Sequence, residues 1–305
     1  MPSITILVGP PGSGKSTYSH NRIYNDGDHG AATVRVSQDD QGKTGHMTVF
    51  ERALHNGQDI IIDRMGFSKE QRNRYLIPAK KAGYETMIVV FHVPMQVCLD
   101  RCNSREGHPT ITDSKIASKA VNFFFSTYER VSDDEADVVK RFGWDAEYRP
   151  MAIVCDLDGT LCEVEHRRHF VRPPEGQKKN WPAFFAGIKD DTVNKACKLL
   201  LIGMSKAHYQ IVYCSGRGEN ERKATVEWLE TNKLDIFAFS PIQKVPLYMR
   251  NRQDSRRDDI VKEIILDFEI LTRYKPVFMI DDRDQVVAMW RKRGFTCLQI
   301  NYGDF

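Results

Sequence analysis

Short apolar runs rich in β-branched residues alternate along this chain with longer segments whose apolar positions recur every three or four residues. The short runs predict strands, and the longer period predicts amphipathic helices. Such alternation is typical of parallel strands covered by helices. In the first half, the expected strands are 3–8, 32–37, 59–63 and 85–93, and the expected helices are 15–25, 44–56, 68–82, 94–103 and 112–128.

A second series of the same kind begins near Met151. Its expected strands are 151–155, 208–214, 236–240, 276–281 and 295–299, and its expected helices are 190–206, 219–232, 256–271 and 283–293. The charged stretch 131–149 between the two series has no strong period, so we expect a linker there, alone or after a terminal helix. The pattern predicts an α/β chain of two tandem three-layer domains with parallel sheets, at 1–149 and 150–305.

Length and composition limit the number of domains and the kinds of binding partner that the chain can have. The chain has 305 residues, enough for two ordinary domains, and its 44 Lys+Arg against 41 Asp+Glu leave a net charge of +3. This balance excludes a polycation that binds nucleic acid by bulk charge alone. The start of the chain lacks the features of a signal peptide, and no apolar run approaches the roughly 20 residues of a membrane span. Seven cysteines without a Cys-x-x-Cys pair predict reduced thiols in a cytoplasmic protein with no membrane partner.

The first chemical motif follows the first strand directly. Residues 9–16 match the G-x-x-x-x-G-K-[ST] phosphate-binding motif. Its glycines let backbone N–H groups converge on a β-phosphate, Lys15 can reach the β- and γ-phosphates, and the Ser16 hydroxyl can bind Mg²⁺. The alternative is an ordinary glycine-rich turn. We expect ATP or another NTP to bind at Gly9, Gly12, Ser13, Gly14, Lys15, Ser16 and Thr17.

Carboxylates end the next two strands. Asp39 is our candidate for the base that accepts a proton from an incoming hydroxyl, because ligands bind at the carboxyl ends of parallel strands. The alternative is that Asp39 and Asp40 cap the next helix. Asp63 is placed to hold the hydration shell of Mg²⁺, or else serves as a cap or a surface ion pair.

A short basic loop follows the fourth strand. Arg101 and Arg105 lie in it, and residues 106–109 come next. Arginines in a mobile lid can clamp phosphoryl oxygens in the transition state. The competing interpretation is a solvated basic loop.

A second motif ends the first strand of the second series, where Asp156 and Asp158 precede Gly159 and Thr160. Asp156 is suited to attack phosphorus, and Asp158 to protonate the leaving oxygen and later activate water. Half of a calcium loop is the alternative, but the later acidic ligands of such a loop do not follow.

Three further groups stand at later positions of the same series. Ser215 ends a strand and can hydrogen-bond a phosphoryl oxygen, and Lys262 lies in a helix and can neutralise the transition state. Asp281 and Asp282 end another strand and supply oxygen ligands for Mg²⁺ together with Asp156. Each has a plain alternative, a turn serine, an exposed lysine or a helix cap, but their joint order favours one phosphoryl-transfer site.

With these residues, the second half resembles the haloacid-dehalogenase-type (DxDxT) phosphatases, and the first half resembles P-loop kinases of the polynucleotide kinase group. Kinase before phosphatase, with segments 256–263 and 280–291 and the ending Gly303-Asp304-Phe305, is similar to the bacteriophage type of bifunctional polynucleotide 5′-kinase/3′-phosphatase. The resemblance implies a P-loop kinase fold followed by a haloacid-dehalogenase-like fold. It also implies Mg²⁺, an NTP donor, RNA or DNA ends as substrates, a homotetramer, and action in a host cytoplasm.

The resemblance assigns roles as well. It makes Asp39 the base for the 5′-hydroxyl and has Arg101 and Arg105 hold the donor phosphates. The phosphatase residues that it implies are Asp156, Asp158, Ser215, Arg217, Arg250, Asp254, Lys262, Asp281 and Asp282. Among these, it places Arg217, Arg250 and Asp254 on the substrate and Asp158 with the metal ligands.

The kinase half departs from the family in two places. The arginine that the family has three residues after the base, and uses on the acceptor's phosphate, is Gly42 here, with Lys43 next to it. Asp63 is followed by Arg64-Met65-Gly66, and the middle of the domain is short. Acceptor recognition is therefore expected to differ from the phage type.

The segment 163–189 is too short for an independent cap domain over a small substrate. It is basic, and an open site beside positive charge suits a nucleic-acid end. Trp181 or Phe170 offers a stacking surface for a base, although core packing is the favoured interpretation of both.

The leading hypothesis is an end-healing enzyme that phosphorylates 5′-OH polynucleotide ends and removes 3′-phosphates, with 2′,3′-cyclic phosphates as a further substrate class. The first alternative is a small-metabolite kinase fused to a metabolite phosphatase. The second is a non-catalytic, nucleotide-gated binding module.

Overall fold

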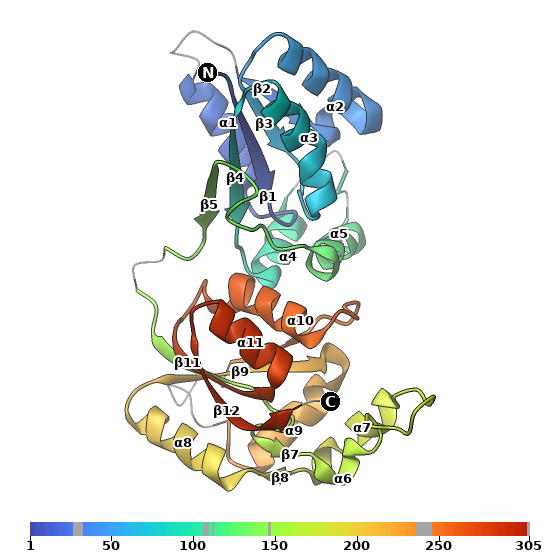
Figure 1. Cartoon of the computed structure of the whole chain (residues 1–305), viewed down its shortest axis with the longest axis vertical. Helices are drawn as coiled ribbons and strands as arrows, with labels where there is room; N and C mark the ends of the chain where they lie inside the picture. The colour runs from blue at the N-terminus through green and yellow to red at the C-terminus, as the bar shows by residue number, and fades with distance from the viewer. Residues whose placement is uncertain (27–32, 106–109, 112, 146–147, 236–245, 304–305) are drawn as a thin grey trace. The chain divides into compact units, whose positions relative to one another are not determined.

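A computed structural model of the chain describes residues 1–26, 33–105, 110–111, 113–145, 148–235 and 246–303. The chain divides into two compact units, residues 1–145 and 146–305 (Figure 1). Each unit holds a five-stranded sheet in which all neighbouring strands are parallel. The fold class is therefore α/β in both units, as the sequence predicts.

The N-terminal sheet has the order β2-β3-β1-β4-β5. Its strands are β1 (Ser3–Val8), β2 (Val34–Ser37), β3 (Ile60–Asp63), β4 (Glu85–Phe91) and β5 (Val138–Phe142). Its helices are α1 (Lys15–Asp26), α2 (Gln38–His55), α3 (Lys69–Lys81), α4 (Met95–Ser104) and α5 (Ser114–Thr127). Because the strands are parallel, the segments that follow β1, β2 and β3 meet at one edge, where Asp63 pairs in register with both Leu7 and Ser37.

The expected linker at 131–149 is wrong for residues 138–142, which form β5 and pair with β4 at the edge of the sheet. Along this strand, exposed and half-buried residues alternate, and the two polar positions, Lys140 and Arg141, interrupt the apolar signal. Charged edge strands are common in natural sheets because they discourage pairing with other chains. The same charge hid the strand from the sequence pattern.

The helix expected at 44–56 begins earlier, at Gln38, and has a kink at Gly42, whose φ is +76°. Asp39 and Asp40 lie in its first turn, and the N-cap position belongs to Ser37. The two aspartates are therefore not the caps that the alternative interpretation proposed, although acidic groups in a first turn do favour the helix dipole.

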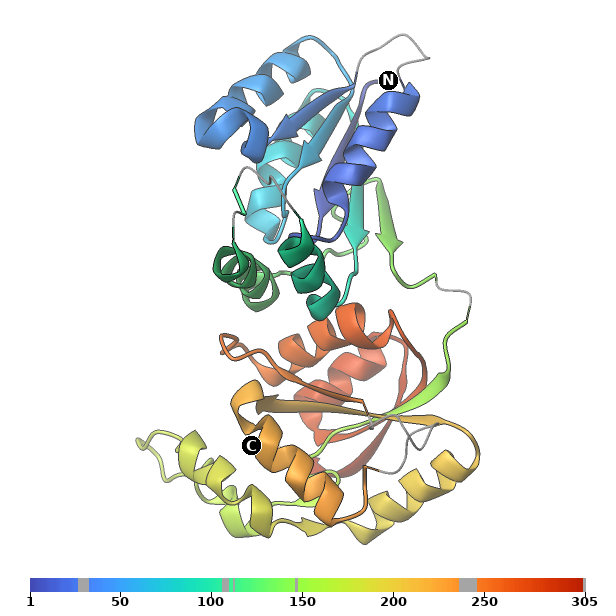
Figure 2. The same ribbon diagram turned by 180° about the vertical axis from the view of Figure 1, so that it is seen from behind.

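The C-terminal sheet has the order β10-β9-β6-β11-β12 (Figure 2). Its strands are β6 (Met151–Cys155), β9 (Gln210–Gly218), β10 (Leu247–Arg250), β11 (Lys275–Arg283) and β12 (Thr296–Gly303). Its main helices are α8 (Lys195–Lys206), α9 (Arg222–Thr231), α10 (Asp258–Ile265), which continues as the π-helix η4 (Leu266–Ile270), and α11 (Asp284–Lys292). The strand expected at 236–240 lies outside the described residues, and β10 was not expected.

Two hydrophobic clusters show that this unit has three layers. Along β6, Ile153 and Cys155 belong to one cluster with residues of α8 and α9. Ala152 and Val154 belong to the other, with residues of α10 and α11. Since successive side chains of a strand point to opposite faces, helices cover both faces of this sheet.

The basic segment 163–189 folds within this unit. It contributes α6 (Glu165–Arg168), α7 (Trp181–Ala186) and most of η2 (Ile188–Asp190), next to a small antiparallel pair of β7 (Cys162–Glu163) and β8 (Thr192–Val193). We call this segment the insert. All seven cysteines of the chain are buried free thiols, and the described part of the chain contains no helix long and apolar enough to cross a membrane.

Candidate functional sites

The glycine-rich loop links β1 to α1 and encloses its own lysine. The Lys15 ammonium donates hydrogen bonds to the carbonyls of Gly9 (2.8 Å) and Pro10 (2.7 Å). Burial lowers the pKa of Lys15 to about 8, against the opposing charge of Asp63. A phosphate group bound in the loop would replace the carbonyls as partners and favour the charged ammonium.

The loop borders a cavity of about 300 Å³ in the N-terminal unit. We call it the kinase cavity. Among the residues expected to bind nucleotide or acceptor, those that line it are Gly12, Gly14, Lys15, Ser16, Asp39, Asp63 and Arg105. Ser13 is buried beside Lys15, and Gly9 closes the loop through a hydrogen bond from its N–H to the carbonyl of Met65. Thr17 is exposed and is not among the lining residues.

The two neighbouring aspartates at the start of α2 differ in their surroundings. Asp40 pairs with Arg35, and the same guanidinium binds Asp63 at 2.5 Å. Asp39 is exposed, lines the kinase cavity and accepts a hydrogen bond from the Thr110 hydroxyl at 2.9 Å. Asp39 is thus the carboxylate of the pair that a substrate hydroxyl can reach.

The two expected lid arginines also differ. Arg105 lines the kinase cavity, whereas Arg101 is placed to donate a hydrogen bond to the carbonyl of Gly12 at 3.4 Å and is not among the lining residues. Residues 106–109, the rest of the expected lid, lie outside the described residues. The structure therefore brings Arg105 to the cavity, whereas Arg101 contacts the backbone of the glycine-rich loop.

A cation that the sequence analysis did not assign lies beside Asp39. Arg64 follows β3, lines the kinase cavity, and bonds to the Gln38 side chain and to the Tyr75 hydroxyl, the latter at 3.0 Å. Lys43 is exposed and does not line the cavity. The departure Arg64-Met65-Gly66 was visible in the sequence, but only the parallel pairing of β2 with β3 brings Arg64 to the cavity that Asp39 also lines.

The C-terminal unit gathers its reactive groups in a buried cluster at the ends of β6 and β11. Lys262, from α10, donates hydrogen bonds to Asp156 at 2.7 Å and to Asp281 at 2.9 Å. Burial raises the pKa of Asp156 well above its usual value; Lys262 opposes the rise and Asp281 adds to it. Burial alone would lower the pKa of Lys262, but Asp156 and Asp281 raise it, so the ammonium stays charged.

Three carboxylates of this cluster fit a divalent cation. One oxygen each from Asp156, Asp281 and Asp282 lies within 4.8 Å of the others. Asp282 has a buried oxygen, Oδ2, without a hydrogen-bond partner, and burial together with Asp281 raises its pKa to about 7. A hard cation would satisfy that oxygen and favour the ionised carboxylates. Gly159 allows this approach, because a Cβ there would lie 2.2 Å from Asp282 Oδ2.

The Asp158 carboxylate lies outside this group of three carboxylates, and its expected place among the metal ligands stays a prediction. Arg217 holds it at 2.6 and 2.8 Å, and Arg167 of the insert holds it at 2.5 Å. Burial alone would raise the pKa of Asp158, but Arg217 and Arg167 keep it well below its usual range. In this arrangement Asp158 is ionised, as a base for water must be. In the sequence, Arg167 stands out only as part of a basic stretch.

Asp258, one helical turn before Lys262, is a second residue that sequence reasoning missed. Its carboxylate lies 3.5 Å from Lys262 and 3.2 Å from Arg250, and a Cβ on Gly216 would lie 2.1 Å from it. Asp254, which the resemblance placed on the substrate, pairs with Arg256 at 2.6 Å and also lines the cavity described below. The i, i+4 spacing of Asp258 and Lys262 was the signal that could have found this residue.

The cluster opens on a cavity of about 490 Å³, which we call the phosphatase cavity. Among the expected residues, those that line it are Asp156, Asp158, Arg217, Arg250 and Asp254. Ser215 is buried just behind, where its hydroxyl accepts a hydrogen bond from the N–H of Arg217 at 3.2 Å. The other members of the buried cluster do not line the cavity themselves but lie next to Asp156, which does; they are Lys262, Asp281 and Asp282.

Comparison with known proteins agrees with the division into two halves. Residues 150–305 match the sequence model of the polynucleotide kinase PNKP phosphatase domain, and residues 43–131 match that of an AAA domain.

Two curated proteins are similar over parts of their length. An Arabidopsis thaliana protein named transcription factor bHLH140 is 31% identical over 134 residues, which are 41% of this chain and 14% of that protein. A putative bifunctional polynucleotide kinase/RNA ligase of Autographa californica nuclear polyhedrosis virus is 21% identical over 315 residues, 94% of this chain and 41% of that protein. The chain thus spans less than half of either relative.

Among solved structures, a chain of the Pnkp1/Rnl/Hen1 complex is 25% identical, with a TM-score of 0.40, over 100% of this chain and 98% of that one. Chaetomium thermophilum Kti12 in complex with ADP-AlF3 is 14% identical, with a TM-score of 0.35, over 47% of this chain and 89% of that one. The phosphatase-domain match covers slightly more than half of the chain and coincides with the buried carboxylate cluster. Through residues 150–305, this chain belongs to the polynucleotide kinase PNKP phosphatase-domain family.

Proposed function

We propose that the protein heals nucleic-acid ends, with a 5′-hydroxyl kinase in the N-terminal unit and a 3′-phosphatase in the C-terminal unit. The observation that carries the proposal is the buried arrangement of Asp156, Lys262, Asp281 and Asp282 within the stretch that matches the polynucleotide kinase phosphatase domain. The loop around Lys15 adds a separate site for a phosphate donor.

In the kinase, the loop and Lys15 would hold the β- and γ-phosphates of ATP or another NTP, with Arg105 at the cavity wall. Asp39 would accept the proton of the 5′-hydroxyl as that oxygen attacks the γ-phosphorus. Ser16 and Asp63 would hold Mg²⁺ or its hydration shell, which spreads the charge of the phosphates.

Arg64 is the cation best placed for the acceptor strand. It lies with Asp39 on the kinase cavity, and its bonds to Gln38 and Tyr75 fix its orientation. An oxygen of the acceptor's own phosphate would there meet a planar, charged donor. This assigns to Arg64 the role that neither Gly42 nor Lys43 can fill.

In the phosphatase, an Asp156 oxygen would attack the phosphorus of the 3′-phosphate, and the bond from phosphorus to the 3′-oxygen would break. Asp158 would give the 3′-oxygen its proton and then take one from the water that hydrolyses the aspartyl phosphate. To protonate the 3′-oxygen, Asp158 must first carry a proton, but Arg217 and Arg167 hold it ionised. This role therefore requires that phosphoryl oxygens of the substrate compete for these two arginines. Lys262 would balance the charge on phosphorus, and Ser215 would hydrogen-bond a phosphoryl oxygen.

Mg²⁺ is the divalent ion we propose for the carboxylates Asp156, Asp281 and Asp282, where it would neutralise the phosphate as the nucleophile approaches. The buried thiols favour a reducing compartment such as the cytoplasm. A homotetramer stays a prediction that light scattering of the purified chain would test.

The deciding experiment uses oligonucleotides with a 5′-hydroxyl and a 3′-phosphate, RNA beside DNA, with ATP and Mg²⁺. We expect label to move from [γ-³²P]ATP to the 5′ end and inorganic phosphate to leave the 3′ end. Turnover confined to small phosphorylated metabolites would contradict the proposal. A 2′,3′-cyclic phosphate end, tested in parallel, shows whether the phosphatase cavity also opens that ring.

A further inference from the structure

Aromatic side chains of α7 form one wall of the phosphatase cavity. Trp181, Phe184 and Phe185 line it together with Asp156 and Asp158. The Trp181 ring stacks on Phe185 at a centroid distance of 5.8 Å and an angle of 24°, and it meets Phe184 edge-on at 5.9 Å. The three rings thus make a continuous apolar surface inside a site whose other groups are largely charged.

Core packing accounts for two other tryptophans of this unit but not for Trp181. Trp228 and Trp290 are 3% and 1% exposed, whereas Trp181 is 39% exposed. Phe170 packs against the hydrophobic core, as the sequence analysis favoured. The same expectation is wrong for Trp181, because the first turn of α7 directs it into the cavity and not into the core. The Asn180 side chain fixes that turn by capping the N–H of Ala183 at 3.1 Å.

The aromatic wall contacts the arginine that binds Asp158. The Arg167 guanidinium lies 4.0 Å from the centre of the Phe184 ring, and the same guanidinium bonds Asp158 at 2.5 Å. Phe184 is buried, so its position is set by packing. A chain of contacts through Phe184 and Arg167 therefore links Trp181 to Asp158.

The cavity is larger than a phosphate requires. Its volume of about 490 Å³ lies within the range of roughly 300–1,000 Å³ typical of pockets for small organic ligands. Flat apolar rings beside phosphate-binding groups match the chemistry of a nucleotide, which has a base with a π-face and an anionic phosphate. We propose that Trp181 stacks on the base of the 3′-terminal nucleotide and so helps to place its 3′-phosphate at Asp156.

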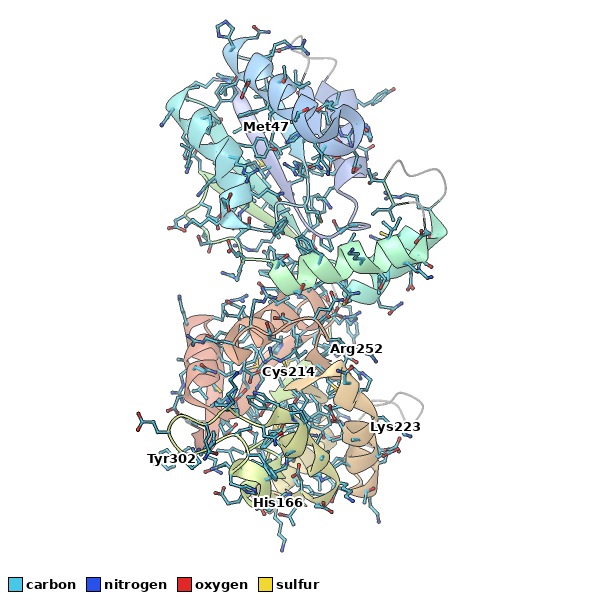
Figure 3. All side chains as sticks on the ribbon, turned by 90° about the vertical axis from the view of Figure 1, so that its right-hand side faces the viewer. Met47, His166, Cys214, Lys223, Arg252 and Tyr302 are labelled. Atoms are coloured by element: carbon cyan, nitrogen blue, oxygen red, sulfur yellow. The ribbon has the colours of Figure 1, made fainter. Side chains whose placement is uncertain are left out.

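This inference rests on the proposed 3′-phosphatase activity, and the test separates the two. Substrates are two oligonucleotides with the same 3′-phosphate, one with a normal 3′-terminal nucleotide and one whose terminal sugar lacks the base. Variants are Trp181→Ala, Trp181→Phe and, as an exposed aromatic away from the cavity, Tyr302→Ala (Tyr302 is labelled in Figure 3). Phosphate release gives KM and kcat for each pair.

In the wild type, removal of the base is expected to raise KM roughly tenfold, the scale of one base–aromatic stack. Trp181→Ala should raise KM for the normal end by a similar factor and leave KM for the abasic end unchanged, since the stack can be lost only once. Trp181→Phe should restore most of the loss, and Tyr302→Ala should behave as the wild type.

Two results would overturn the inference alone: Trp181→Ala affecting both ends equally, which indicates a structural role, or affecting neither. A wild-type protein that releases no phosphate from either oligonucleotide overturns the proposed function and this inference with it. Phosphate release from the abasic end at the wild-type kcat shows that the C-terminal unit of Trp181→Ala is folded, and unchanged 5′-phosphorylation shows the same for the N-terminal unit.

Discussion

The kinase cavity and the phosphatase cavity both lie at the carboxyl ends of parallel strands, yet they differ in how far their charged side chains are buried. The kinase cavity has its candidate base, Asp39, exposed and is bordered by the backbone of a glycine-rich loop. The phosphatase buries Asp156, Asp281, Asp282 and Lys262, each 6% exposed or less.

The chemistry explains the difference. A kinase receives its reactive phosphoryl group on a nucleotide, so the protein needs mainly to position phosphates and accept one proton. A phosphatase that forms an aspartyl phosphate must keep its own nucleophile, a lysine and a cation site in register before substrate arrives. Burying several carboxylates carries an unfavourable desolvation free energy, and the positive charges of Lys262 and the cation would offset it.

The largest effect should come from Asp156→Asn. The amide cannot attack phosphorus, so 3′-phosphate release should fall about 10⁴-fold or more, while 5′-phosphorylation continues. Parallel assays of both activities on one oligonucleotide measure this. Asp259→Asn, a change to an aspartate of the same unit that does not line the cavity, should leave both activities intact. Residual phosphate release near the wild-type rate in the Asp156 variant would rule out a phosphoenzyme.

Asp39→Ala should produce the converse loss. Without the base, 5′-phosphorylation should drop by about 10² to 10⁴-fold, and 3′-phosphate release should not change, because the two sites lie in separate units. Asp40→Ala is the matched control, since Asp40 does not line the kinase cavity. The assignment would fail if the Asp40 variant lost more kinase activity than the Asp39 variant.

A smaller effect is expected for Arg64→Ala. If Arg64 binds the acceptor's phosphate, KM for a nucleoside 3′-phosphate acceptor should rise roughly tenfold, while KM for ATP stays constant. Lys43→Ala should change neither value. An equal loss for acceptors with and without the 3′-phosphate would show that Arg64 acts only through its bonds to Gln38 and Tyr75.

The smallest expected effect is the uptake of protons when ATP binds. Burial lowers the pKa of free Lys15 to about 8, and the phosphates of a bound nucleotide should raise it. Between the free and bound pKa values the complex holds more protons than the free protein, so ATP affinity should fall as pH rises above about 8. Calorimetry in buffers of different ionisation enthalpy should detect uptake of up to about one proton at pH 8–9, absent from Lys15→Met. Heats independent of the buffer would contradict the expected shift.

The elements were largely predictable because each has a period or a motif of its own. β1 and the loop after it form the expected strand and glycine-rich turn, and β6 ends at Cys155, directly before Asp156, as expected. The failures are where local signals were weak: β5 is hidden by charge, and the short elements of the insert have no full period. The early start of α2 was missed because Gly42 interrupts the pattern.

The site residues also divide into those that local motifs predict and those that depend on tertiary contacts. Motif spacing alone predicted Lys15, Asp39, Asp156, Lys262 and the Asp281-Asp282 pair as site residues, because each stands at a strand end or one turn from a marked residue. Sequence spacing does not report which distant side chains meet. Arg167 on Asp158, Asp258 beside Lys262 and Arg64 beside Asp39 all depend on contacts between separate elements.

By itself, then, the sequence determined two α/β units, the glycine-rich loop and the candidate nucleophile Asp156, since periodicity and short motifs are local properties of the chain. Tertiary structure alone decided the protonation of Asp158, the orphaned oxygen of Asp282 and the exposure of Trp181. The physical reason is that charge, desolvation and burial depend on which side chains surround a group in space, and those neighbours come from remote parts of the chain.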